Sequence, residues 1–298
     1  MKKSILLLNG SSGTGRIREI CFDLIEQLYR AGYRTEVCPV IPEDSQRINE
    51  FLNEKGPKCD LLVCAGGDGT LFHLVNTLMK MKKKPVIGYL PTGSTNDFAR
   101  GIEIPTDLPS ACRILTEGKP FAYDVGCLNG TYYNYVAAFG AFSSVSYSTD
   151  QDVKNVLGHT AYTINGLSHL GENLNYRTHL KIKADHFQAE GDYLFGAIYN
   201  SISIGGFVIS PENTPDNGKF DIMLIKAPDN IAEASSIFGA LANQEIDRCP
   251  EILHREISSA EILFDRPTKW TLDGEYGGIF DRASFSVASK AVTIMVSR

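Results

Sequence analysis

Two short polar stretches of the sequence carry residue types suited to binding a nucleotide. The first, Gly66-Gly67-Asp68-Gly69-Thr70, follows an apolar run and precedes a helical pattern that starts at Leu71. Glycines let backbone N–H groups approach an anion closely, and a helix N-terminus adds the positive end of its dipole, so this loop suits a phosphate. Asp68 would repel a bare phosphate, which indicates a magnesium–nucleotide complex as the ligand. The alternative is a glycine turn in which Asp68 only caps the helix.

The second stretch, Pro91-Thr92-Gly93-Ser94-Thr95-Asn96-Asp97, follows another apolar run at residues 85–90. Ligands of an open parallel sheet bind at the carboxyl ends of its strands. Because each stretch follows a predicted strand, the two loops are expected to be neighbours over one crevice. Asp68 and Asp97 could then share a metal ion.

Strands and helices must position these loops. The first 120 or so residues alternate the two, with strands expected at 4–9, 33–38, 60–65 and 85–90 and helices at 17–31 and 45–54. This order predicts an α/β domain with a parallel sheet covered on both faces. Beyond residue 122, helices are expected only near 152–171 and 230–242. Short strands separated by Gly, Asn and Asp fill the rest and predict a largely antiparallel second domain.

Composition narrows the class of protein. The chain has 298 residues, 43% of them apolar, which is enough for two cores. Its net charge of −6 argues against broad nucleic-acid binding. Seven cysteines without a C-x-x-C spacing favour reduced thiols in a cytosolic protein. The apolar run after the basic start is too short for a signal peptide, and no run approaches the roughly 20 residues of a membrane span.

The two stretches together resemble the diacylglycerol kinase catalytic family, whose soluble bacterial lipid kinases carry GGDGT and then P-x-G-T-x-N-D-F-A-R. Residues 138–170, 200–221 and 272–275 follow in the family's order, so the resemblance covers nearly the whole chain. GGDGT alone is shared with NAD kinases, whereas its combination with NDFAR and a late DGE is highly specific. The resemblance implies a nucleotide-binding kinase domain at 1–127 and a β-rich, sandwich-like lipid-binding domain at 128–298.

A third loop, after the first strand, is implied to wrap the phosphates. It is not a Walker A motif, because Arg16 and Ile17 follow its last glycine, and a plain connecting turn is the alternative. This chain departs from the family at Gly10, where proline is usual, at Ser94, where threonine is usual, and at Phe72-His73, which replace an Asn-Glu pair. The implied ATP-binding residues are Asn9, Gly10, Ser11, Ser12, Gly13, Gly66, Gly67, Asp68, Gly69, Thr70, Leu71, Ser94 and Asn96.

Asp124 alone is typical of a turn residue. The resemblance instead places it with Asp68 and Asp97 in a water-mediated magnesium network. Three carboxylates suit a hydrated magnesium ion, which prefers oxygen ligands and loses its water reluctantly.

Asp273-Gly274-Glu275 alone is typical of a hairpin turn. The resemblance implies that Glu275 accepts the proton of the substrate hydroxyl and that Asp273 orients it or the magnesium. Phosphoryl transfer requires mainly positioning and charge neutralisation, with one carboxylate directing the nucleophile.

Residues 214–219 match a loop that binds a structural magnesium ion in relatives. The implied ligands are Asn217 and the backbone carbonyls of Thr214 and Lys219, with Asp216 as an alternative. A neutral amide oxygen is a weaker ligand for a hard dication than a carboxylate. The site is therefore expected to be weak or empty.

The sequence thus predicts an ATP- and magnesium-dependent lipid kinase of phospholipid metabolism, with its catalytic cleft between the two domains and diacylglycerol or a related lipid as substrate. We expect a cytoplasmic protein that contacts the inner face of the membrane transiently, and a homodimer is left open. One alternative is an NAD kinase-like enzyme. The other is a degenerate nucleotide-binding regulatory module, suggested by the departures at Gly10, His73 and Asn217.

Overall fold

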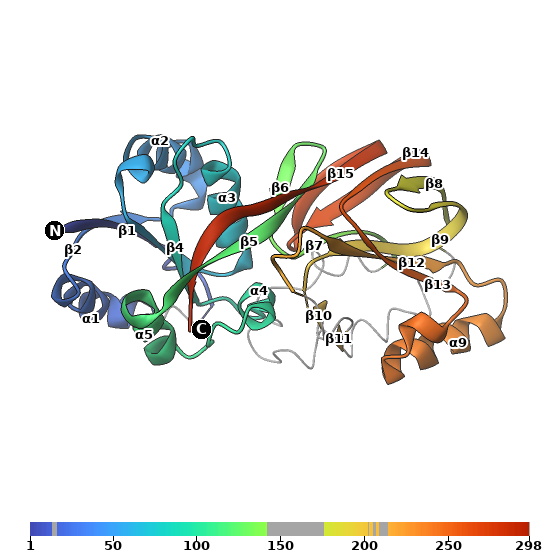
Figure 1. The fold of residues 1–298 in the computed structure, drawn as a ribbon, viewed down its shortest axis with the longest axis horizontal. Coiled ribbons are helices and arrows are strands. Elements are labelled where there is room, and N and C mark those ends of the chain that lie inside the picture. The colour runs from blue at the N-terminus through green and yellow to red at the C-terminus, as the bar shows by residue number, and fades with distance from the viewer. Residues whose placement is uncertain (14–16, 142–175, 202, 205–206, 209–213, 298) are drawn as a thin grey trace. The chain divides into compact units, whose positions relative to one another are not determined.

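The computed structural model describes residues 1–13, 17–141, 176–201, 203–204, 207–208 and 214–297, which form two compact units (Figure 1). The first unit comprises Met1–Tyr123 and Lys290–Arg298, and the second comprises Asp124–Ser289. The boundary expected at residue 127 differs from this division, and residues 290–298 were expected in the second domain. They lie in the first unit because Ile294 pairs in parallel with Ile87.

The first unit is built on a parallel sheet, as predicted. Its strand order is β2-β1-β3-β4-β15, with β15 contributing its last residues. Helices α2 and α3 lie on one side of this sheet and α1 and α5 on the other (Figure 1). The elements are β1 (Lys2–Leu8), α1 (Ile17–Arg30), β2 (Tyr33–Pro39), η1 (Pro42–Asp44), α2 (Ser45–Lys55), η2 (Gly56–Lys58), β3 (Leu61–Gly66), α3 (Asp68–Leu78), β4 (Val86–Pro91), α4 (Asp97–Gly101), α5 (Leu108–Glu117), the start of β5 (Lys119–Leu128) and the end of β15 (Glu275–Val296).

Amphipathic spacing explains how α1 packs on the sheet. Ile17, Leu24 and Leu28 recur at helical intervals and are fully buried. They pack in one core cluster with Leu6 of β1 and Val63 of β3. Burial of a leucine contributes about 1.5–3 kcal/mol, so this face holds the helix against the sheet.

The second unit is β-rich and largely antiparallel, as predicted. Its main strand order is β13-β12-β9-β7-β14-β15, and β8 pairs with β9 and β14. The helix expected near residues 152–171 lies outside the described residues. Besides the remainder of β5 and β15, the elements are β6 (Thr131–Tyr133), β7 (Val136–Gly140), β8 (Thr178–Ala184), β9 (Gln188–Tyr199), β10 (Ser203–Ile204), β11 (Phe207–Val208), β12 (Phe220–Lys226), α9 (Ile231–Asn243), η3 (Ile246–Arg248), β13 (Ile252–Ile257) and β14 (Ser259–Leu272).

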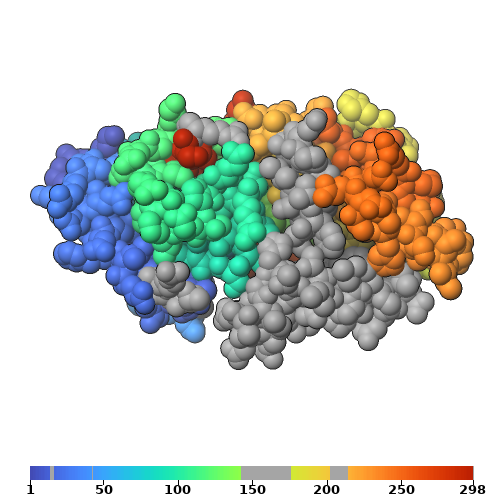
Figure 2. All heavy atoms as spheres, turned by 90° about the horizontal axis from the view of Figure 1, so that it is seen from below, coloured from blue at the N-terminus to red at the C-terminus, as the bar shows by residue number. Residues whose placement is uncertain are grey.

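Helix α9 matches the helix expected at 230–242. It begins after Asn230, whose side chain accepts the N–H of Glu233 at 3.0 Å, a common N-cap arrangement. Its atoms are seen at the surface of the second unit (Figure 2), and Ile231 is 86% exposed. No helix in the described part of the chain combines the length and the apolar character needed to cross a bilayer.

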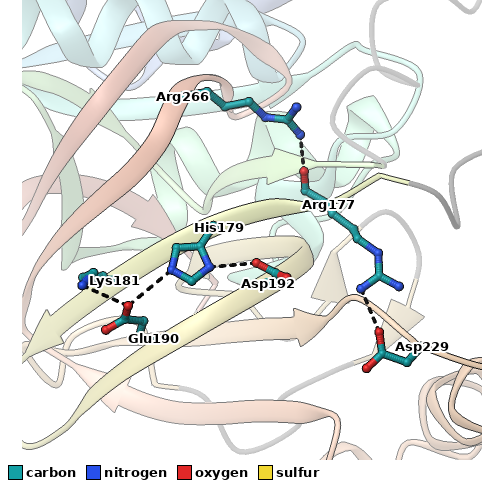
Figure 3. Close-up of polar contacts among 7 residues, drawn as sticks. All are labelled: Arg177, His179, Lys181, Glu190, Asp192, Asp229 and Arg266. Atoms are coloured by element: carbon teal, nitrogen blue, oxygen red, sulfur yellow. Dashed lines mark hydrogen bonds and ion pairs between the residues drawn. The ribbon is translucent and has the colours of Figure 1, made fainter.

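An ionic network lies on the exposed face of β8 and β9 (Figure 3). The ring of His179 contacts Asp192 at 2.8 Å and Glu190 at 3.4 Å, and Lys181 contacts Glu190 at 2.9 Å. Hydrogen bonds to Asp192 and Glu190 raise the pKa of His179. Exposed pairs of this kind contribute little to stability.

Candidate active site

Three loops of the first unit meet through glycines. A Cβ on Gly67 would lie 3.2 Å from the Cα of Gly93, and a Cβ on Gly93 would lie 2.8 Å from the Cα of Gly67. Gly13, with φ of +57°, has the carbonyl oxygen of Thr92 only 2.0 Å from its Cβ position. The loops approach this closely because these residues lack side chains.

Hydrogen bonds join the same loops. The Asn9 side chain donates to Thr70 Oγ1 at 2.9 Å, and the Asn9 backbone donates to the carbonyl of Ala65 at 2.8 Å. The backbone N–H of Thr92 donates to the carbonyl of Gly66 at 2.9 Å. The structure therefore brings together the three segments that the sequence predicted to bind the nucleotide.

Helix α3 starts immediately after the glycine turn. Gly67 is its extended N-cap residue, and Leu71, Leu74, Val75 and Leu78 are buried on its apolar side. The first N–H groups of a helix have no carbonyl partner within it and carry its positive dipole end. Packing of α3 thus directs a helix terminus suited to an anion at the contact between the loops.

The carboxylate of Asp68 is held by the second loop. It accepts the backbone N–H of Asp97 at 3.0 Å and lies 3.4 Å from the Tyr89 hydroxyl and 3.5 Å from Thr95 Oγ1. Asp97 is the first residue of α4 and is 7% exposed. The structure therefore places Asp68 and Asp97 side by side, as the strand-end argument predicted.

Asn96 forms a strained corner beside these aspartates. Its φ of 51° and ψ of 45° lie in the left-handed region, and its side chain donates to the Gly93 carbonyl at 2.9 Å. Within the described residues, the buried Asn96 Oδ1 and Thr92 Oγ1 have no hydrogen-bond partner. Buried polar atoms almost always have one. Two such atoms beside a glycine-lined contact fit a site that receives a polar ligand.

Arg18 is a neighbour of this site that the sequence did not single out. A Cβ on Gly10 would lie 2.7 Å from Arg18 Nε, so the guanidinium occupies the space that the family's proline ring would need. The helical spacing of α1 identifies Arg18 as a surface residue, but only the folded loop shows that it lies against Gly10. Three other residues of the first unit differ from the family pattern. Of these, Phe72 is buried, whereas His73 and Ser94 are exposed.

Asp124 belongs to the second unit and lies inside β5, so a plain turn residue was the wrong reading. Its fully buried carboxylate accepts the N–H of Gly218 at 2.5 Å and the hydroxyl of Ser289 at 3.1 Å, and its own N–H donates to Pro215 at 2.8 Å. No group of three or more His, Cys, Asp or Glu side chains among the described residues is arranged to hold a metal ion. The three-aspartate magnesium network stays a prediction.

Protein groups close the loop at 214–219. Asn217 Oδ1 accepts the N–H of Lys219 at 2.8 Å, and the ammonium of Lys219 contacts Glu256 at 2.9 Å. Asn217 is exposed, and its amide nitrogen is 3.5 Å from Glu256. The amide oxygen expected to bind magnesium therefore already accepts a hydrogen bond from the loop.

The DGE segment forms the hairpin turn between β14 and β15. Asp273 and Gly274 both have positive φ, 50° and 84°, and Leu272 pairs with Glu275 across the turn, which is the geometry of a two-residue type I′ hairpin. Glu275 is partly exposed, whereas Asp273 is 3% exposed. The turn therefore presents one carboxylate to solvent and buries the other.

Asp273 is surrounded by donors. Its carboxylate accepts the N–H and the side-chain amide of Asn134 at 2.6 and 2.9 Å, and the N–H groups of Tyr135 and Val136 at 2.9 and 3.1 Å. Burial raises the pKa of Asp273 to about 6, although the donors favour its charged form. At neutral pH the group is mainly a carboxylate.

Comparisons with known proteins agree with this geometry. Residues 3–128 match the sequence profile of the diacylglycerol kinase catalytic domain. Two diacylglycerol kinases, from Staphylococcus aureus (strain MRSA252) and Staphylococcus carnosus (strain TM300), are each 28% identical to this chain over 93% of its length and are covered over 87% and 90% of theirs.

Solved structures show the same fold. A crystal structure of a diacylglycerol kinase from Bacillus anthracis str. Sterne covers 99% of this chain and is matched over 96% of its own, with 18% identity and a TM-score of 0.73. Another structure from that organism has the same coverage, 22% identity and a TM-score of 0.81. Residues 3–128 thus match a diacylglycerol kinase catalytic domain and the chain is similar to diacylglycerol kinases over nearly its whole length, which supports an ATP-dependent lipid kinase, a phosphotransferase with an alcohol group as acceptor.

Proposed function

We propose that the lipid substrate is diacylglycerol and that the first unit binds ATP as its magnesium complex. The contact between Gly13, Gly67 and Gly93, with Asp68 held beside Asp97, is the observation that carries the nucleotide site. The names of the relatives support the choice of lipid.

In this proposal the residues of the first unit bind and orient the nucleotide. Backbone N–H groups at the start of α3 receive the phosphates, and Asn96 and Thr92 offer polar atoms to the ligand or its water. Asp68, Asp97 and Asp124 would hold the hydrated magnesium ion, which would neutralise charge on the transferred phosphoryl group. The backbone N–H of Asp97 fixes the direction of the Asp68 carboxylate before any ligand arrives.

Glu275 of the second unit is proposed to accept the proton of the lipid hydroxyl as the hydroxyl oxygen attacks the γ-phosphorus and the bond to ADP breaks. Its partly exposed position on a rigid hairpin supports this role, since a proton acceptor must reach the substrate. Asp273 would orient the turn that carries it. We propose that the loop at 214–219 is held by protein groups in place of a magnesium ion.

The enzyme would use cytosolic ATP and contact the inner face of the membrane transiently, where its lipid resides. Cosedimentation with phospholipid vesicles tests that contact. A homodimer is the remaining expectation, and sedimentation velocity over a range of concentrations tests it.

The deciding experiment is phosphorylation with labelled ATP and magnesium of a panel of diacylglycerol, phosphatidylglycerol, undecaprenol and a sphingoid base in detergent micelles, with NAD in a lipid-free arm. We expect the highest kcat/KM with diacylglycerol. A higher value for another lipid would replace the substrate, labelled NADP would favour the NAD kinase alternative, and ATP binding without any transfer would favour the regulatory module.

A further inference from the structure

We propose that Asn134 is a positioning residue for phosphoryl transfer. With the backbone N–H groups of Tyr135 and Val136 it forms a cradle, residues 134–136, that holds the Asp273 carboxylate and thereby sets the direction in which Glu275 projects. This inference rests on the proposed role of Glu275 as proton acceptor. Asn134 stands 139 residues before Asp273 and belongs to none of the motifs.

The cradle provides a hydrogen-bond donor for every lone-pair position of the Asp273 carboxylate. Asp273 Oδ2 accepts both donors of Asn134, and Oδ1 accepts the donors of Tyr135 and Val136. A carboxylate has about four lone-pair positions, so these four donors fill them. Asn134 is 2% exposed, and Asp273 is 3% exposed. Asp273 is thus committed to orienting the turn, and a metal ion would have to displace protein donors to reach it.

The cradle also holds the backbone of the turn. The N–H of Asp273 donates to the carbonyl of Val136 at 2.8 Å, and Leu272 pairs with Ala137 of the neighbouring strand. Asp273 has φ of 50°, which residues other than glycine rarely adopt. Five hydrogen bonds between Asp273 and residues 134–136 maintain this conformation, and Glu275 follows two residues later. The direction of the Glu275 side chain therefore depends on the hydrogen bonds that hold Asp273.

Asn134 supplies the one side-chain donor of the cradle, so it is the position where the cradle can be weakened selectively. Asn134→Ala removes one donor of four and keeps every backbone donor. A small displacement of a catalytic group lowers the rate strongly, since misplacement by about 1 Å can lower it 100-fold. We expect Asn134→Ala to lower kcat roughly 10- to 100-fold with the KM for ATP unchanged. Asn134→Ser, whose hydroxyl can donate, should recover part of the loss.

Asn129, in the turn between β5 and β6, provides a matched control. Its side chain donates to the carbonyl of Arg282 at 2.9 Å and accepts the N–H of Ser284 at 2.8 Å, so it also ties a distant turn to β15. These partners lie well along β15 from Glu275. Asn129→Ala should therefore lower the melting temperature while kcat stays within about twofold of the parent, because it removes comparable hydrogen bonds without reaching the DGE turn.

The decisive measurement combines Asn134→Ala with Glu275→Gln. If Asn134 acts through Glu275, the double variant should be no slower than Glu275→Gln alone. Losses that multiply in the double variant would overturn the inference, because they would show a general effect on the fold. Equal losses of kcat in Asn134→Ala and Asn129→Ala, each in proportion to the unfolded fraction seen in the melting curves, would overturn it as well.

The same set separates the inference from the function on which it rests. A fully active Asn134→Ala beside an inactive Glu275→Gln would overturn the inference alone. A fully active Glu275→Gln would overturn the proposed role of Glu275, and the role of Asn134 would fall with it.

Discussion

The glycine loops of the first unit and the DGE turn of the second unit are held in place for opposite reasons. Gly13, Gly67 and Gly93 bring three backbones into contact because side chains are absent. The DGE turn is fixed because one side chain, Asp273, is present and fully buried among backbone donors. Adding atoms at these glycines should therefore disturb the loops of the first unit. Removing or altering polar atoms around the DGE turn should disturb the second unit.

The largest loss of activity is expected when Glu275 in the DGE turn of the second unit is changed. Glu275→Gln keeps the shape of the side chain but cannot accept the proton, so kcat and kcat/KM should both fall roughly 100- to 10,000-fold. ATP affinity and the melting temperature should be unchanged. Steady-state lipid phosphorylation, equilibrium ATP binding and a melting curve check this, and unchanged turnover would leave the segment as a hairpin only.

The next largest loss of activity is expected when the charge of Asp68 in the first unit is removed. Asp68→Asn keeps the shape and removes the carboxylate beside Asp97, so activity should fall roughly 100-fold or more, as for other preorganised electrostatic groups. The fold should persist. Turnover near that of the parent in a folded variant would contradict the metal-network assignment.

The outcome at Asp68 and Asp97 shows what strand-end reasoning can predict. Both residues follow apolar runs that read as parallel strands, so their proximity follows from topology, and the structure places them together. Asn134 and Arg18 were not predictable in this way. Their contacts join segments whose relation depends on three-dimensional packing, and neither residue type at its position carries a local signal.

The end of the chain was misassigned for a related reason. Residues 290–296 continue the same strand that starts at Glu275, and a sequence reading gives no sign that one strand serves two units. At Asp124 only the alternative of a plain turn was wrong, because burial inside β5 with donors from Gly218 and Ser289 makes it a strand residue; its place in a magnesium network stays a prediction.

Adding one methyl group tests the glycine contact directly. Gly93→Ala would place Cβ 2.8 Å from the Cα of Gly67 and 2.9 Å from Asn96 Oδ1, so the loops must separate. We expect ATP to bind about tenfold more weakly, measured by calorimetry. Gly239→Ala in α9 is the matched control, because no atom lies within 4 Å of its Cβ position, and it should bind ATP like the parent. Equal ATP affinity in both variants would contradict the glycine argument.

The partly buried His254 gives a smaller, pH-dependent effect in the second unit. Burial opposes the charged form of His254, but hydrogen bonds to Asp221 and Asp247 outweigh it and raise its pKa. A raised pKa adds stability below the unfolded-state pKa of about 6.5, and this stability is lost as pH rises through the folded-state pKa. His254→Asn should therefore be destabilised more at pH 5.5 than at pH 8.5. Urea unfolding at both pH values measures this, and an equal loss at both would contradict the assignment.

The smallest effect is expected at the loop closed by Asn217. Asn217→Asp supplies the missing carboxylate, so magnesium without nucleotide should stabilise the variant but not the parent. The gain is only about 0.4 kcal/mol at a concentration equal to Kd, so melting curves are needed over a magnesium series. An equal response in both proteins would show that Asn217 or Asp216 already binds the ion.

The parallel pairing of Ile294 with Ile87 has a consequence for how the chain is made. Strand β4 has β3 on one side and the end of β15 on the other, so its second edge stays unpaired until the last strand leaves the ribosome. An apolar strand with an open edge is prone to pair with other chains. The sheet of the first unit is therefore completed only after the second unit has been synthesised, and a chain truncated just before residue 290 should aggregate through that edge.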